Sequence, residues 1–184
     1  MSRLTIYADT DPGTPTLTTG DPIAIAAALA PIGVRFERWD SPVALAPDAE
    51  SAAVLAAYQP YLDTLMNPSG VAGGGAGSAD VLRMTPDNPA APALRTKFLS
   101  EHIHTEDEVR FFVDGAGSFV LHIDGQVFDA YCTAGDLISV PAGTKHWFDA
   151  GPSPRFTALR VFQDTTGWTP HFTGDAIAER FPVA

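Results

Sequence analysis

From about residue 98 onward, apolar and polar residues alternate with a period of two, which is typical of β-strands buried on one face. These runs are short, and glycine turns separate them, so they indicate an antiparallel barrel or a double-sheet jelly roll. They are EVRFFVDG, SFVLHIDG, QVFDAYCTAG, DLISVPAG, HWFDAG and RFTALRVF. The IDGQ step at 123–126 predicts a tight hairpin, because Asp-Gly tolerates the positive φ angles of a type I′ turn.

The first half of the chain is rich in alanine and proline and carries helical signals instead. Asp21 is placed as the N-cap of a helix, Pro22 takes its first position, and Pro31 and Gly33 mark its exit. The segment VRFERW at 34–39 then predicts a strand, because apolar and charged residues alternate along it.

Further helices are expected at 47–67, interrupted or restarted at Pro60, and after Asn88, which is a plausible cap. Between them, residues 67–80 have no periodicity and many glycines, which predicts a mobile surface loop. We therefore expect one domain over 1–184, with strands and helices in 1–97 and a barrel in 98–184.

Composition and charge narrow the class of protein. The 184 residues are 45% hydrophobic and 18% charged, which is ordinary for a globular chain. A net charge of −11 disfavours nucleic acid and anionic membranes as partners. The apolar stretch at 23–30 is too short to span a bilayer. With a lone cysteine, Cys132, and no secretory signal pattern at the start, a cytoplasmic location is expected.

The segment EHIHTEDEVRFF at 101–112 concentrates potential metal ligands. Residues two apart in a strand share a face, so His102 and His104 project together. Glu108 rejoins that face if the chain turns around 105–107. Imidazoles with a carboxylate suit zinc, iron, nickel or copper better than calcium. The alternative interpretation of this segment is an acidic surface loop whose histidines face the solvent.

A second segment, GDLISVPAGTKH at 135–146, turns a corner at Pro141 and delivers His146 to the next strand. Together the two segments read H-x-H-x3-E-x6-G and G-x5-P-x-G-x2-H. This resembles the two signature motifs of the cupin superfamily. The resemblance implies a mainly β fold, the cupin double-stranded β-helix or jelly-roll barrel, with a few short helices mostly in the N-terminal half. It also implies a metal held by His102, His104, Glu108 and His146. Thr96 and Ala150 depart from the pattern at positions outside the ligand set.

Four protein ligands leave two positions open on an octahedral ion, whereas a structural zinc site is closed and tetrahedral. Two open positions would let an enediolate chelate the metal through two oxygens. The metal would then stabilise the dianion as a Lewis acid and hold the electron-rich carbon within reach of dioxygen.

Three longer runs resemble the acireductone dioxygenase family of methionine salvage: 97–123, 135–162 and 167–182. The resemblance implies a monomer that cleaves 1,2-dihydroxy-3-keto-5-methylthiopentene with dioxygen. With Fe(II) the products would be formate and 4-methylthio-2-oxobutanoate. With Ni(II) in the same ligands they would be formate, carbon monoxide and 3-methylthiopropanoate.

The roles of residues beside the ligands are inferred from their positions in the predicted strands and from this resemblance. Strand alternation turns Arg110 inward, where a dianionic substrate would balance a guanidinium that is costly to bury alone. A buried pair with Glu101 or Asp107 is the alternative. Arg160 is a weaker candidate for the same cationic role and could equally be structural.

Strand alternation turns Glu101 away from the ligands, and the resemblance implies that it assists metal incorporation. Asp107 is likewise expected beside the ligands, where it would relay conformational change around Glu108. A solvated acidic turn would account for both residues as well. Three aromatic residues are expected to line the substrate pocket, although each could be ordinary core: Phe98, Phe148 and Trp168. A further hypothesis places Trp168 on a flap that closes over the site.

The remaining histidines and the cysteine are assigned no chemistry. His122 is expected to be a strand histidine with a structural partner, and His171 to lie on the surface. Cys132 is expected to be a small buried hydrophobic residue.

Two other functions are compatible with the same predicted fold. A sugar-phosphate isomerase would need several basic residues at the pocket, and only Arg110, Arg160 and Lys145 are near. A non-catalytic metal-binding cupin would be expected to have lost a ligand, and all four are present.

Overall fold

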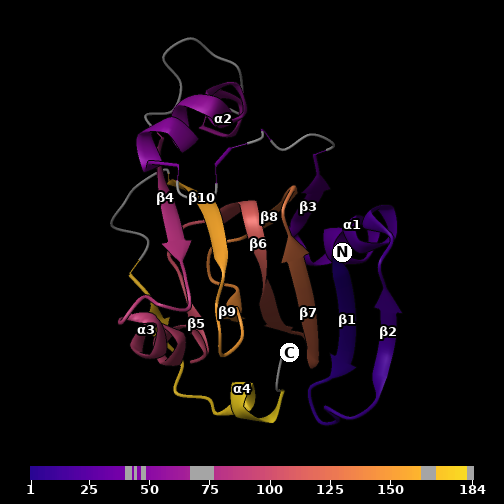
Figure 1. Ribbon diagram of the computed structural model, residues 1–184. Coiled ribbons are helices and arrows are strands. Elements are labelled where there is room, and N and C mark those ends of the chain that lie inside the picture. Colours follow the sequence, from indigo (N-terminus) through magenta and orange to yellow (C-terminus); the bar gives the residue numbers. More distant parts are fainter. Residues whose placement is uncertain (40–42, 44, 47–48, 67–76, 163–168, 182–184) are drawn as a thin grey trace.

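Antiparallel β-strands are the main elements of the structure, a computed structural model shown in Figure 1. It describes residues 1–39, 43, 45–46, 49–66, 77–162 and 169–181. The strands are β1 Arg3–Ala8, β2 Pro15–Thr19, β3 Arg35–Arg38, β4 Ser78–Met84, β5 His102–Ile103, β6 Glu108–Ile123, β7 Gln126–Thr133, β8 Asp136–Val140, β9 Lys145–Asp149, β10 Phe156–Phe162 and β11 His171–Phe172. The helices are α1 Pro22–Leu29, the short 3-10 helix Ala30–Ile32, α2 Ser51–Met66, α3 Ala91–Phe98 and α4 Ile177–Arg180.

Two sheets share one long strand. The first sheet runs β11-β5-β9-β6-β7-β1-β2, and the second joins β4, β10, β6, β8 and β3. Strand β6 belongs to both: its first half pairs with β8 and β10, and its second half with β7 and β9. The change of partners falls at Gly115, which has a φ of 72° that favours glycine. The expected pair of short strands at this point is therefore one strand that turns from one sheet into the other.

Strands from the first half of the chain complete both sheets. β1 pairs with β7, β3 with β8, and β4 with β10. Residue 98 is therefore no boundary in the fold, because the barrel draws on both sides of it. Of the four N-terminal strands, only β3 is among the predicted elements, although Leu4 and Ile6 already alternate along β1.

Strand alternation decides which side chains point into the barrel and which point out of it. Glu108, Arg110 and Phe112 of β6 turn inward, whereas Phe111 turns outward onto α2. Helix α2 presents one buried face, formed by Val54, Tyr58 and Leu62 at a spacing of four. On the other sheet Ile177 of α4 and Phe181, which follows the helix, cover Val120, Val127 and Trp147. Figure 1 shows α2 at the top of the molecule and α4 at the bottom.

Several local expectations are confirmed. Asp21 Oδ1 accepts a hydrogen bond from Ile23 N at 3.0 Å and caps α1. Asp124 and Gly125 have φ angles of 50° and 74°, as a type I′ hairpin requires. His122 has structural partners, His171 is exposed, and Cys132 is fully buried.

Other local expectations are corrected. Helix α2 continues through Pro60 without a break. Its buried face offsets the hydrogen bond that the proline cannot make. The third helix begins at Ala91, and Asn88 Oδ1 instead accepts from Ala90 N in the preceding turn. The expected loop at 67–80 ends earlier, because Ser78–Met84 is strand β4, and residues 67–76 lie outside the described residues.

No described helix is both long enough and apolar enough to cross a membrane.

Candidate metal centre

The four expected ligands come together inside the barrel from three strands and a turn. His102 lies on β5, His146 on β9 directly opposite it, and Glu108 begins β6. His104 lies in the turn after β5, and its carbonyl accepts from Gly143 N at 2.8 Å. All four side chains are buried. Ligands that are distant in the sequence meet in one site because β5 and β9 are neighbours in the first sheet.

The separations between ligand atoms suit a single small ion. Ligand nitrogens of the three histidines lie within 4.8 Å of one another. Glu108 Oε2 is 2.8 Å from His146 Nε2 and 3.7 Å from His104 Nε2. Two ligands about 2.1 Å from a common ion, at right angles, would be about 3 Å apart. The observed spacing therefore matches atoms arranged around one centre.

Two of the imidazoles are held in the tautomer that a metal ligand needs. His102 Nδ1 lies 2.7 Å from Ser100 O, and His146 Nδ1 lies 2.8 Å from Thr144 O. A carbonyl only accepts, so each Nδ1 must carry the proton and donate it. Each Nε2 is left with its lone pair facing the other ligands.

Two buried ligand atoms also lack a conventional partner. Glu108 Oε2 and His146 Nε2 are 2.8 Å apart, but among the described residues neither makes a hydrogen bond of acceptable geometry. Buried polar atoms are normally satisfied, and an ion that contacts both atoms would satisfy this pair. A divalent cation fits this donor set of three imidazoles and one carboxylate.

The protonation of the ligands follows from burial and from neighbouring charges. Burial, aided by the neighbouring His146, lowers the pKa of His102 to about 4, and burial also lowers the pKa of His104. Burial opposes ionisation of Glu108, but Arg110 and His146 outweigh it and hold the pKa of Glu108 well below its usual range. Burial would likewise lower the pKa of His146, yet the Glu108 carboxylate raises it. The ionised Glu108 carboxylate therefore favours a positive charge beside it and His146.

Arg110 and Arg160 face each other across β6 and β10 above the metal ligands. Arg110 Nη2 is 2.6 Å from Glu108 Oε1, so its neighbouring carboxylate is Glu108 rather than Glu101 or Asp107. Burial lowers the pKa of Arg110 to about 10, against the pull of Glu108, and it stays a cation at neutral pH. Arg160 binds both carboxylate oxygens of Asp80 on β4, with Nε to Oδ1 at 2.7 Å.

The ligands form the polar end of a cavity of about 130 Å³. Phe98 and Phe148 line it, together with residues that were not predicted to belong to the site: Leu82, Lys97, Phe112, Phe119, Phe156, Ala158 and Pro170. Strand alternation from Arg110 to Phe112 could have identified one of these. Trp168 lies outside the described residues.

Gly117 accounts for the position of Phe148 in the cavity wall. A Cβ at Gly117 would lie 2.3 Å from Phe148 Cζ, which no real contact allows. The ring therefore packs directly over the backbone of β6, and any larger residue at 117 would push it inward.

Glu101 and Asp107 do not line the cavity. Glu101 faces away from the ligands, as expected, and binds His122 Nδ1 at 2.7 Å and Thr173 Oγ1 at 2.5 Å. Asp107 Oδ1 accepts from Ala142 N at 2.9 Å, which ties the turn after β5 to the turn before β9. Both side chains thus connect segments that carry ligands.

A jelly-roll barrel that holds three imidazoles and a carboxylate around one point is a metal-binding cupin. Comparison with known proteins narrows the class. A family model described as the ARD/ARD′ family matches residues 3–170. The chain belongs to this family.

Named relatives cover the whole chain. It is 64% identical over 184 residues to the acireductone dioxygenase of Granulibacter bethesdensis, covering 100% of both chains. It is 63% identical to the acireductone dioxygenase of Acidiphilium cryptum, covering 100% of this chain and 99% of the relative. Among solved structures, the acireductone dioxygenase from Bacillus anthracis with a cadmium ion in its active centre matches with a TM-score of 0.76. That match has 27% identity and covers 94% of this chain and 98% of the other. That neighbour holds a metal ion in its active centre, and this chain brings together three histidines that could hold one.

Proposed function

We propose that this chain is an acireductone dioxygenase that cleaves 1,2-dihydroxy-3-keto-5-methylthiopentene with dioxygen in methionine salvage. The observation that carries the proposal is the cavity itself, in which four metal ligands, two guanidinium groups and an aromatic wall face one space. The names of the full-length relatives support the same substrate.

The resident ion is proposed to be Fe(II) or Ni(II), one per chain, held by His102, His104, Glu108 and His146. When bound, it supplies Lewis acidity toward the two adjacent oxygens of an enediol. Fe(II) would give formate and 4-methylthio-2-oxobutanoate, and Ni(II) would give formate, carbon monoxide and 3-methylthiopropanoate. Imidazole and carboxylate ligands accept either ion, so the donor set allows both.

The protein's own groups bind and orient the substrate. Arg110 is proposed to stabilise the substrate dianion, because it stays charged in a buried place beside the ligands. Arg160 is proposed to add positive charge from the opposite strand. Phe98 and Phe148 offer aromatic surface to the thioether tail, since sulfur packs well against ring edges. Trp168 is proposed to add to this surface.

Glu101 and Asp107 are proposed to act on the ligands through the backbone. Glu101 links the segment before His102 to β6 and to residue 173, a place from which it could assist metal incorporation. Asp107 connects the turns that hold Glu108 and His146. We further propose a single-domain monomer that works in the cytoplasm.

The test is turnover by protein loaded separately with each metal. Iron-loaded protein should consume dioxygen with the acireductone and release the keto acid. Nickel-loaded protein should release carbon monoxide. An iron-loaded protein that takes up no dioxygen would rule out the dioxygenase and leave a different or non-catalytic cupin. Light scattering in the same preparation checks for the monomer.

A further inference from the structure

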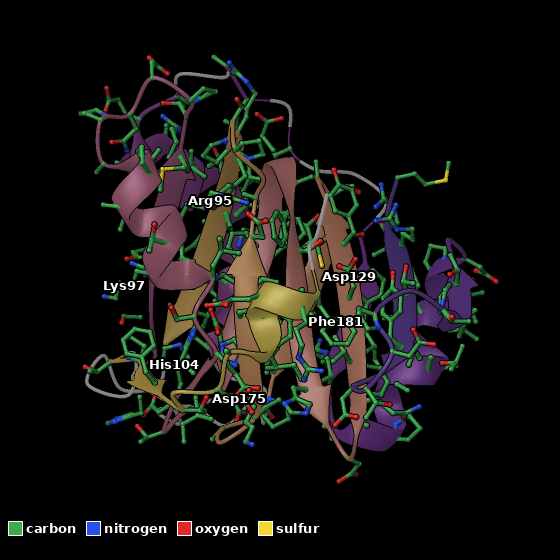
Figure 2. All side chains as sticks on the ribbon, turned by 90° about the horizontal axis from the view of Figure 1, so that it is seen from below. Arg95, Lys97, His104, Asp129, Asp175 and Phe181 are labelled. Carbon is green, nitrogen blue, oxygen red and sulfur yellow. The ribbon has the colours of Figure 1, made fainter. Side chains whose placement is uncertain are left out.

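Lys97 is a cation in the cavity wall that the proposed chemistry leaves without a role. It lies on α3 next to Phe98, and its side chain is exposed while lining the cavity. Lys97 and Lys145 are the chain's two lysines. Figure 2 labels Lys97 and His104 on the same side of the molecule. An exposed residue in the lining of a buried site lies at the opening of that site.

The charges of the other cavity cations are already matched. Arg110 contacts Glu108 at 2.6 Å, and Arg160 forms a two-point contact with Asp80. Among the residues that the structure describes, Lys97 forms no ion pair with an acidic side chain. Its positive charge is therefore available to an incoming anion.

Helix α3 is anchored so that Lys97 stays at this opening. Arg95 Nε and Nη2 bind Asp149 Oδ1 and Oδ2 at 2.9 and 2.8 Å. The side chain of Asp149 is 2% exposed, and it lies on β9, the strand that carries His146. A bidentate contact of this kind fixes both distance and orientation. The backbone of Lys97, two residues after Arg95, is thus tied to the strand of the metal ligand.

We propose that the Lys97 ε-ammonium draws the anionic substrate to the cavity and holds it at the opening. The inference rests on the proposed function, in which the substrate is an enediol that binds as an anion. A chain with a net charge of −11 repels such a molecule over most of its surface. A cation beside the opening offsets that repulsion at the place where the substrate enters the cavity.

The first test compares Lys97→Met with Lys145→Met in the metal-loaded enzyme. Both variants lose one lysine charge, but Lys145 is exposed and strand alternation turns it away from its neighbour His146. In Lys97→Met we expect kcat/KM to fall about 5-fold at low ionic strength, mainly through KM. Lys145→Met should stay within about twofold of the wild type.

Salt separates a charge effect from a structural one. In the wild type kcat/KM should fall as salt is added, because screening weakens the attraction. In Lys97→Met it should be nearly flat, and the two enzymes should converge at about 0.5 M salt. Lys97→Arg should restore most of the loss, and Lys97→Glu should deepen it. Equal salt dependence in the wild type and in Lys97→Met would overturn the inference.

Oxalate binding tests the inference without turnover. Oxalate is a planar dianion that can chelate a metal through two oxygens, and calorimetry can follow its binding to the nickel-loaded protein. Weaker binding in Lys97→Met than in Lys145→Met supports the role of Lys97 even if the protein fails to consume acireductone. Equal binding in the two variants overturns that role even if acireductone is consumed.

Discussion

Two of the three imidazoles of the metal centre depend on a backbone contact as much as on their own positions in the sequence. His102 and His146 both donate from Nδ1 to the carbonyl two residues earlier, so the same local arrangement occurs on two neighbouring strands. This contact fixes the ring and directs Nε2 at the common point. Spacing of two in the sequence places a histidine on the correct face, and the carbonyl then sets the tautomer.

His146→Ala should abolish metal retention and turnover. The three remaining ligands would come from one short segment, with no ligand left on β9 to close the site. Metal content after gel filtration should fall at least tenfold. His171→Ala, which removes an exposed histidine from β11, is the matched control and should keep full occupancy. Full iron occupancy in His146→Ala would refute the ligand assignment.

Arg110→Ala should keep its metal but lose activity. The metal itself balances the buried Glu108 carboxylate, whereas the substrate dianion loses its guanidinium partner. We expect kcat/KM to fall about 100-fold, a loss of about 3 kcal/mol in transition-state stabilisation. Arg110→Lys should have an intermediate kcat/KM, since an ammonium keeps the positive charge but not the bidentate geometry of a guanidinium. Unchanged rates in Arg110→Ala would show that other groups balance the substrate charge.

At the scale of elements, the site is a junction of short segments that other contacts hold in place. β5 has only two residues, and its position depends on β9 and β11 on either side. The Asp107–Ala142 hydrogen bond joins the two turns that carry ligands. Helix α3 forms one side of the cavity and is attached to β9 through Arg95 and Asp149.

Arg95→Met should therefore destabilise the protein more than an ordinary surface change. It leaves the buried Asp149 carboxylate without its cation, which we expect to cost about 2 kcal/mol in free energy of unfolding. Arg35→Met removes the exposed pair with Glu37 and should cost less than about 0.5 kcal/mol. Chemical denaturation of both variants measures the difference. Equal stabilities would show that α3 is held by its apolar contacts instead.

At the scale of the whole molecule, the barrel does not depend on the metal for its core. Buried apolar residues fill the barrel around the site, and others pack on the outer faces of the two sheets against α2 and α4. Burial of apolar surface is the dominant driving force for such a fold. The site is therefore expected to be preformed before the ion binds.

Removing the metal with a chelator should lower the melting temperature without unfolding the sheets. At 100 times its dissociation constant, a ligand that binds only the folded state adds about 2.7 kcal/mol. For a chain of this size that corresponds to roughly 5–10 °C. Circular dichroism should keep its β signal in the metal-free protein. A chelator-treated protein that loses its β signal at room temperature would show that folding and metal binding are one event.

The short strands after residue 98 and the hairpin at 123–126 could be predicted from the sequence pattern, and the four candidate ligands from their resemblance to the cupin motifs. The strands and the hairpin depend on residues close together in the chain, where alternation and turn chemistry leave few choices. By contrast, the pairing of Arg160 with Asp80 joins residues 80 apart, and it places part of a predicted loop in strand β4. Similarly, only the pairing of distant strands makes β6 one strand in two sheets and brings Lys97 to the opening of the metal site. Local chemistry decides which side chains can act, and tertiary contacts decide which of them meet, because those contacts depend on how the whole chain packs.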